Sequence, residues 1–215
     1  MRTGLKRKVL LAISGVIGCA LTVAVVYTIL PLRENIRTAL TTMQAHLSAP
    51  ATAPFPVIDT YGLSKTQIAI IDLARQEYAK HPISYDQNVL TYTQGDKQAW
   101  CADFISWVML KVGVPYNNPN SGSWRIPGVY TLQEYYQSMR KYETVGSYTP
   151  QPGDVAFYIG KSAFGLNTSG HVALVIGADH GHMTTIGGNE GGRLRIDTQA
   201  IQPGVNRLVG FGRLD

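Results

Sequence analysis

The hydrophobic period of the chain changes at Pro152-Gly153, and this change limits the fold more than any other feature. Before it, residues 65–81 and 100–112 place apolar side chains at helical spacing, and Ser64 with Gln67 forms a capping-box pattern. After it, short β-rich runs alternate with turns. The runs are residues 154–160, 171–177, 182–188, 193–198 and 208–214. Helices first and strands second predict an α+β domain, in which a helical layer packs on an antiparallel sheet.

Two local signals add detail to this prediction. Thr131 and Glu134 are placed to cap a third helix that continues to about Tyr142. Asp179-His180-Gly181 is typical of a hairpin turn. The strands on either side of that turn are therefore expected to pair, with the end of the second beside the start of the first.

Residues 9–30 form a run of 22 residues without a charge. As a helix they reach about 33 Å, enough to cross a hydrocarbon core of about 30 Å. The basic tail 1–8 predicts a cytoplasmic N-terminus and an exported remainder by the positive-inside rule. We therefore predict a transmembrane signal anchor at 9–30, a stalk and Pro/Ala-rich linker at 31–61, and one compact domain at 62–215.

Two other fates of the apolar run stay open. Val16-Ile17-Gly18-Cys19 resembles a lipoprotein processing box, although the residues after Cys19 remain largely apolar. A cleaved signal is the second alternative, but the run is longer than the usual apolar region of about 7–15 residues. The compact domain is exported in all three cases.

The net charge of +5 does not indicate nucleic-acid binding. Residues 1–39 hold six basic side chains and one glutamate, which account for the whole excess. Residues 40–215 hold thirteen basic and thirteen acidic side chains. The positive charge is therefore a topology signal at the membrane and not a phosphate-binding patch.

Cys101 is the single cysteine outside the apolar run, so the exported domain cannot form an internal disulfide. It stands at the predicted start of the helix at 100–112, and helix N-termini favour the reactive thiolate form. The alternative is a small buried hydrophobe, because free cysteine is among the most buried residue types. Trp100 and Trp107 on the same segment are expected in the core.

The candidate base is His171, which opens a β-run directly after Ser169-Gly170. A histidine at the start of a strand is held rigidly enough to meet a nucleophile, although a satisfied polar residue is the alternative. His180 and His182 flank a hairpin glycine, and the sequence offers no carboxylate or thiol set around them for a metal. We predict no metal and no cofactor.

A third group must orient the imidazole of a Cys–His pair. The expected hairpin brings Asn189 beside the start of the preceding strand, with Glu190 and Asp197 as alternatives. Asn189 between Gly188 and Glu190 is also typical of a simple turn. The identity of the third group therefore stays open at this level.

The segments WCADFISWV, PGDVAFY, SGHVALVIG and TTIGGN resemble, in order and spacing, the CHAP family of cysteine, histidine-dependent amidohydrolases and peptidases. The resemblance covers residues 65–213. It implies a papain-like fold, with Cys101 as nucleophile, His171 as base and Asn189 as orienting residue. Many members carry a carboxylate two positions before the asparagine, where this chain has Gly187.

The resemblance also implies an activity. A chain of this kind is expected to be a membrane-tethered cysteine hydrolase on the outer face of the bacterial cytoplasmic membrane. It would cleave amide bonds in peptidoglycan, as an endopeptidase or an N-acetylmuramoyl-L-alanine amidase. Its expected partners are peptidoglycan, the membrane through 9–30 and an envelope-spanning complex. The alternative is a catalytically idle wall-binding or scaffolding domain, which Gly187 favours.

Four further residues are candidates for supporting roles. Asp103 is expected either to anchor the helix start or to be a solvated first-turn carboxylate. Gln94 is a candidate oxyanion donor, with an exposed loop position as the alternative. Trp124 and Tyr130 are candidates for a substrate groove.

Overall fold

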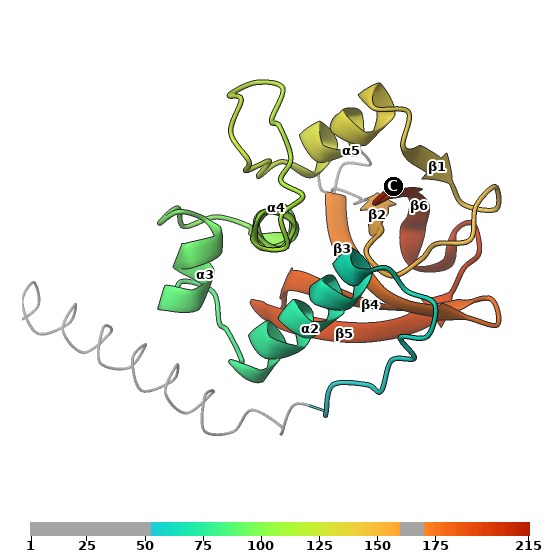
Figure 1. Ribbon diagram of the computed structural model, residues 1–215. Coiled ribbons are helices and arrows are strands. Elements are labelled where there is room, and N and C mark those ends of the chain that lie inside the picture. The colour runs from blue at the N-terminus through green and yellow to red at the C-terminus, as the bar shows by residue number, and fades with distance from the viewer. Residues whose placement is uncertain (1–52, 160–169) are drawn as a thin grey trace, which may run out of the picture. The chain divides into compact units, whose positions relative to one another are not determined.

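The computed structural model describes residues 53–159 and 170–215 (Figure 1). The predicted tail, anchor and most of the linker lie outside these residues and stay predictions. Within the described ranges, no helix has both the length and the apolar character that a bilayer crossing requires. The compact unit runs from Pro54 to Asp215.

The helices come first, as the hydrophobic period predicts. The hydroxyl of Ser64 accepts a hydrogen bond from the Gln67 N–H at 3.3 Å, and the Gln67 side chain accepts one from the Ser64 N–H at 2.9 Å. This is the expected capping box. The helices are α2 (Lys65–Ala79), α3 (Gln87–Tyr92), α4 (Cys101–Lys111) and α5 (Val129–Ser138).

The strands form one antiparallel sheet in the order β1-β6-β2-β3-β4-β5. His180 and Gly181 take the left-handed backbone, with φ of 48° and 76°, in the tight turn between β3 and β4. The α+β prediction is therefore confirmed. The strands are β1 (Tyr142–Thr144), β2 (Val155–Ile159), β3 (Gly170–Asp179), β4 (His182–Glu190), β5 (Arg193–Ala200) and β6 (Leu208–Gly212), with the short 3₁₀ turn η1 (Val205–Arg207) before β6.

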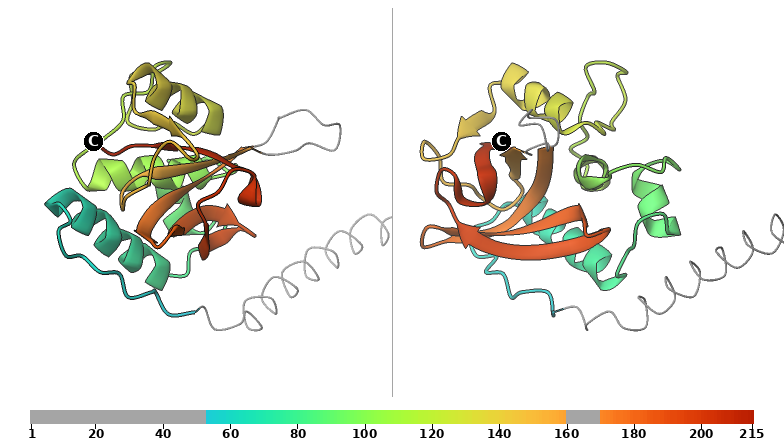
Figure 2. Two further views of the ribbon diagram at one scale, coloured as in Figure 1. Left: turned by 90° about the vertical axis from the view of Figure 1, so that its right-hand side faces the viewer. Right: turned by 180° about the vertical axis from the view of Figure 1, so that it is seen from behind.

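Helix α4 packs on strands β3 and β4 and contacts α2, α3 and α5 (Figures 1 and 2). All its residues from Cys101 to Met109 are buried. Trp100 and Trp107 lie in the main core as expected, which α4 shares with β3 and β4. Each large apolar side chain buried there contributes about 1.5–3 kcal/mol, so the position of α4 relative to the sheet is strongly fixed.

Helix α5 differs from its prediction. It begins at Val129 with Gly128 as N-cap, so Thr131 and Glu134 lie inside the helix and do not cap it. It ends at Ser138 because Arg140 takes a left-handed φ of 56° and the following residues pair with β6 as strand β1. Helix α3 was not expected from the sequence.

The segment before α2 belongs to the compact unit, although the linker was expected to extend to residue 61. The ring of Phe55 packs edge-on against Tyr78, with centroids 6.0 Å apart, and the guanidinium of Arg75 lies 5.1 Å above it. Ile58 also packs on the core. Aromatic and aliphatic contacts of this kind hold the segment on the domain.

We expect the change Asp154→Ala to lower the free energy of unfolding by about 2–4 kcal/mol. The buried carboxylate of Asp154 accepts hydrogen bonds from the Tyr148 hydroxyl and from the N–H groups of Gln151 and Leu214, at 2.8–2.9 Å. Its loss leaves these donors without an acceptor. Urea unfolding followed by circular dichroism measures the change. Asp72→Ala, which breaks an exposed pair with Arg75, should cost less than about 0.5 kcal/mol.

Candidate active site

Cys101 is the first residue of α4, and 6% of its surface is exposed. Trp100 is the N-cap and makes no side-chain capping hydrogen bond. Its indole N–H instead donates to Oγ of Ser84 at 2.9 Å, and its ring lies so close to Gly188 that a Cβ there would approach it to 2.7 Å. These contacts fix the start of α4. The sulfur therefore lies at an N-terminus, which is the electrostatic environment that favours thiolates.

His171 is the second residue of β3 and lies within hydrogen-bonding range of the Cys101 side chain. Its Nε2 is 3.1 Å from Oε1 of Glu190. Burial alone would lower the pKa of His171, but the hydrogen bonds and charges of Cys101 and Glu190 outweigh burial and raise it to about 9. The imidazole is therefore protonated at neutral pH, and a proton donor stands beside the sulfur.

The end of β4 lies beside His171, as the expected hairpin requires, but its two polar residues point to different partners. The β4–β5 register shifts between Gly187 and Glu190, and Asn189 takes a left-handed φ of 62°. Oδ1 of Asn189 accepts a weak hydrogen bond from Oγ of Ser84 at 3.4 Å. Glu190, the alternative named from the sequence, is the residue whose side chain meets the imidazole.

Gly187 leaves the space that the Glu190 carboxylate occupies. A Cβ at position 187 would lie 1.9 Å from Oε1 of Glu190 and 2.9 Å from Nε2 of His171. No real side chain tolerates such distances. The space beside His171 at position 187 is thus filled by a carboxylate that arrives from three residues further along the chain.

A second carboxyl group lies behind Glu190. Asp197 on β5 hydrogen-bonds Glu190, and burial together with the negative charge of Glu190 raises the pKa of Asp197, against the lowering effect of Arg195. The Asp197 carboxylate lies 3.9 Å from Nε of Arg195. Asp197 is thus held between Glu190 and Arg195 at the edge of the site.

Asp103 is fully buried and anchors the start of α4, which was one of its two expected roles. Its carboxylate accepts hydrogen bonds from Nε of Arg125 at 2.5 Å and from Nε2 of Gln98 at 2.9 Å. Arg125 also pairs with Asp96 at 2.7 Å. These contacts tie the loops before and after α4 to its first turn.

The remaining sequence candidates lie at the surface around α4. Gln94 is exposed, with a left-handed φ of 55° just after α3. Tyr130 is 41% exposed on the first turn of α5, and Trp124 is partly buried against the main core. No local sequence pattern marks Ser84 or Arg125, because their roles arise from contacts with distant segments.

Part of the chain that holds these residues matches a known family model. Residues 93–189 match the CHAP domain, and the matched segment includes Cys101, His171 and Asn189. Similar solved structures include the crystal structure of Ly7917 (15% identity, 70% of this chain and 62% of that chain, TM-score 0.44). Another is Ly7917 with the hydrolyzing product of MDP (14% identity, 67% and 61%, TM-score 0.41). The chain spans about three fifths of the length of these structures. No curated protein matches the chain.

We expect Gly187→Ala to lower the free energy of unfolding by about 1–3 kcal/mol, because the new methyl group displaces the Glu190 carboxylate. In a Glu190→Ala background the same change should cost at least about 1 kcal/mol less. Urea unfolding of the four proteins at pH 7 measures the coupling. Gly177→Ala, whose Cβ would meet Ile58 at an ordinary 3.4 Å, is the control. Its cost in the free energy of unfolding should simply add to the cost of Glu190→Ala. Additive costs at position 187 would contradict the packing argument.

Proposed function

Because residues 93–189 match the CHAP domain, we propose that the chain is an exported, membrane-tethered cysteine hydrolase that cleaves amide bonds in peptidoglycan. The observation that carries the proposal is the contact of Cys101, at the start of α4, with an imidazole whose Nε2 is held by Glu190. The three groups come from three different elements and meet at one point. They are the nucleophile on α4, the acid–base group on β3 and the orienting carboxylate on β4.

The reaction is acyl transfer in two steps. The Cys101 thiolate attacks the scissile carbonyl carbon and forms a C–S bond, and backbone N–H groups at the start of α4 stabilise the oxyanion. The C–N bond breaks as His171 passes its proton to the leaving amine. Water then attacks the thioester and gives a proton to His171, and the C–S bond breaks to release the acid and restore the Cys101 thiolate. Since Nε2 faces Glu190, Nδ1 is the nitrogen that exchanges protons with the reacting groups.

Glu190 takes the orienting role in this proposal, and Asn189 takes a supporting one. The carboxylate fixes the ring and stabilises the imidazolium, as the acidic member of a hydrolase triad does. Asn189 instead bonds Ser84, which also binds the Trp100 indole before Cys101. Asn189 therefore acts on the position of the nucleophile through Ser84 and Trp100.

The family resemblance and the predicted export topology support peptidoglycan as the substrate. The bond is either within the stem peptide or cross-bridge, or between the muramoyl group and L-alanine. An anchor at 9–30 confines the reaction to wall close to the membrane, where an envelope-spanning complex needs local openings. The predicted location is the outer face of the bacterial cytoplasmic membrane.

A catalytically idle wall-binding domain is the competing proposal, and Gly187 was its main support. The position of the Glu190 carboxylate weakens that support, because the charge absent at 187 is supplied at the same place from residue 190.

We expect Cys101→Ala to abolish the release of soluble fragments from purified cell wall, because the variant has no nucleophile. The fall in turbidity of a wall suspension measures the rate, and mass spectrometry of the products identifies the cleaved bond. Asp72→Ala, remote from the site, is the control and should keep the full rate. Equal release by the wild type and Cys101→Ala would leave only the idle-domain proposal.

We expect the wild-type kcat/KM to fall as the pH rises through about 9, because His171 must be protonated to stabilise the thiolate and release the amine. Glu190→Gln removes one of the two partners, Cys101 and Glu190, that raise the pKa of His171, so the alkaline limb should move to lower pH. The loss of orientation should also lower kcat/KM by about 100-fold.

Asn189→Gly is the matched comparison, because glycine tolerates the left-handed backbone at this position while the amide is lost. It should leave the alkaline limb of the pH profile in place and lower kcat/KM less than Glu190→Gln does. Orientation by Asn189 would instead be indicated if Asn189→Gly moved the limb and Glu190→Gln did not.

A further inference from the structure

A cavity of about 570 Å³ opens beside the imidazole of His171 and the carboxylate of Glu190. Strands β2, β3, β4 and β5 and the turn η1 all contribute to its wall. A group that enters it lies next to the reacting centre. Its lining includes Tyr158, His171, Glu190, Asp197, Gln199 and Arg207.

A chain of polar side chains crosses the wall of this cavity. Gln199 on β5 is nearly buried, and its Nε2 donates to the Tyr158 hydroxyl on β2 at 3.1 Å. The Nδ2 of Asn206 in η1 donates to Oε1 of Gln199 at 2.6 Å. The turn η1 is therefore fixed to the sheet by the buried side-chain amide of Gln199, which both donates and accepts a hydrogen bond.

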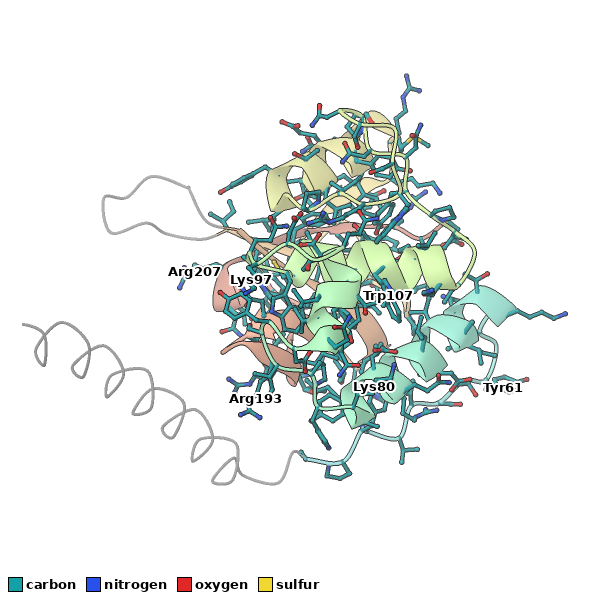
Figure 3. All side chains as sticks on the ribbon, turned by 90° about the vertical axis from the view of Figure 1, so that its left-hand side faces the viewer. Tyr61, Lys80, Lys97, Trp107, Arg193 and Arg207 are labelled. Carbon is teal, nitrogen blue, oxygen red and sulfur yellow. The ribbon has the colours of Figure 1, made fainter. Side chains whose placement is uncertain are left out.

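The turn holds two successive residues in a backbone conformation that side chains disfavour. Asn206 and Arg207 have φ of 47° and 62°, in the left-handed region. Such a conformation costs free energy for a residue other than glycine and persists where surrounding contacts enforce it. The bond from Asn206 to Gln199 is that contact. Its effect is to bring Arg207 to the mouth of the cavity, where the side chain projects outward (Figure 3).

The charges around the cavity leave Arg207 as the cation in excess. Glu190 is paired with His171 at 3.1 Å. Asp197 lies 3.9 Å from Arg195 and shares a hydrogen bond with Glu190. Arg207 forms no ion pair with any residue in the described ranges 53–159 and 170–215. The acidic side chains of the cavity are thus engaged, and the guanidinium is available.

We propose that this cavity is a subsite for a free carboxylate of the substrate and that Arg207 binds that carboxylate. A guanidinium matches a carboxylate with two parallel charge-assisted hydrogen bonds. The inference rests on the proposed hydrolase function and deepens it. The substrate is a peptide that carries a free carboxylate close to the amide bond that is cleaved.

The same cavity is less suited to an ammonium group. An amine that entered it would compete with His171 for Glu190 and with Arg195 for Asp197, and Arg207 would repel it. A carboxylate meets Arg207 without breaking either pair. The excess charge therefore decides between the two ligand classes.

Binding of matched peptides to the full-length Cys101→Ala protein tests the subsite without hydrolysis. The probes are two synthetic stem peptides that differ only in whether their carboxyl groups are free or converted to carboxamides. We expect the free-carboxylate peptide to bind about tenfold more tightly by calorimetry, and the preference to shrink as salt is added. Adding Arg207→Gln should remove the preference, and Arg207→Lys should retain part of it.

Arg140→Gln is the matched control, because Arg140 is also exposed and left-handed, with φ of 56°, but lies after α5. It should keep the tenfold preference. Equal affinity for the two peptides, no binding of either, or a preference that survives Arg207→Gln would overturn the subsite. If the wild type digests wall but shows no carboxylate preference, the subsite fails and the hydrolase stands. If the preference is present but wall digestion is absent, the hydrolase fails and the subsite stands.

Discussion

Nε2 of His171 lies 3.1 Å from Oε1 of Glu190, and this hydrogen bond needs the space that glycine leaves at position 187. Any larger residue there would expel the carboxylate. Without the carboxylate, only the interactions with Cys101 would oppose burial, and the pKa of His171 would fall. The protonation state of the site thus depends on the absence of a side chain as much as on the presence of one.

The other half of the site depends on packing. Helix α4 is buried over nearly its whole length, and Trp100 fixes its first residue against Gly188 and Ser84. Such a helix cannot shift relative to β3 and β4 without opening the core, so its N-terminus stays beside His171. The buried carboxylate of Asp103 then ties the flanking loops to the same turn through Arg125. The nucleophile is therefore placed by the core and not by a flexible loop.

The sequence allowed most of the helices and strands to be predicted, and also the Cys101–His171 pair, because periodicity, capping and turn residues are local signals. Helix α5 and strand β1 were misjudged at their boundary, since β1 exists through pairing with β6, which lies far along the chain. The sequence pointed to Asn189 with Glu190 as an alternative, but period-2 alternation cannot show which of the two side chains faces His171 where the register shifts. The space at Gly187 is visible only in three dimensions.

The position of the Glu190 carboxylate also has a cost that the surrounding residues offset. It places Glu190 against Asp197, and two ionised carboxylates in contact repel each other. Burial and that repulsion raise the pKa of Asp197, and the guanidinium of Arg195 opposes the rise. His171 lies 3.1 Å from Glu190 and Arg195 lies 3.9 Å from Asp197, so each carboxylate has a basic partner and Arg207 is left over at the same cavity. Orientation of the base and selection of the substrate are therefore linked through Glu190 and Asp197, which both line the cavity beside His171.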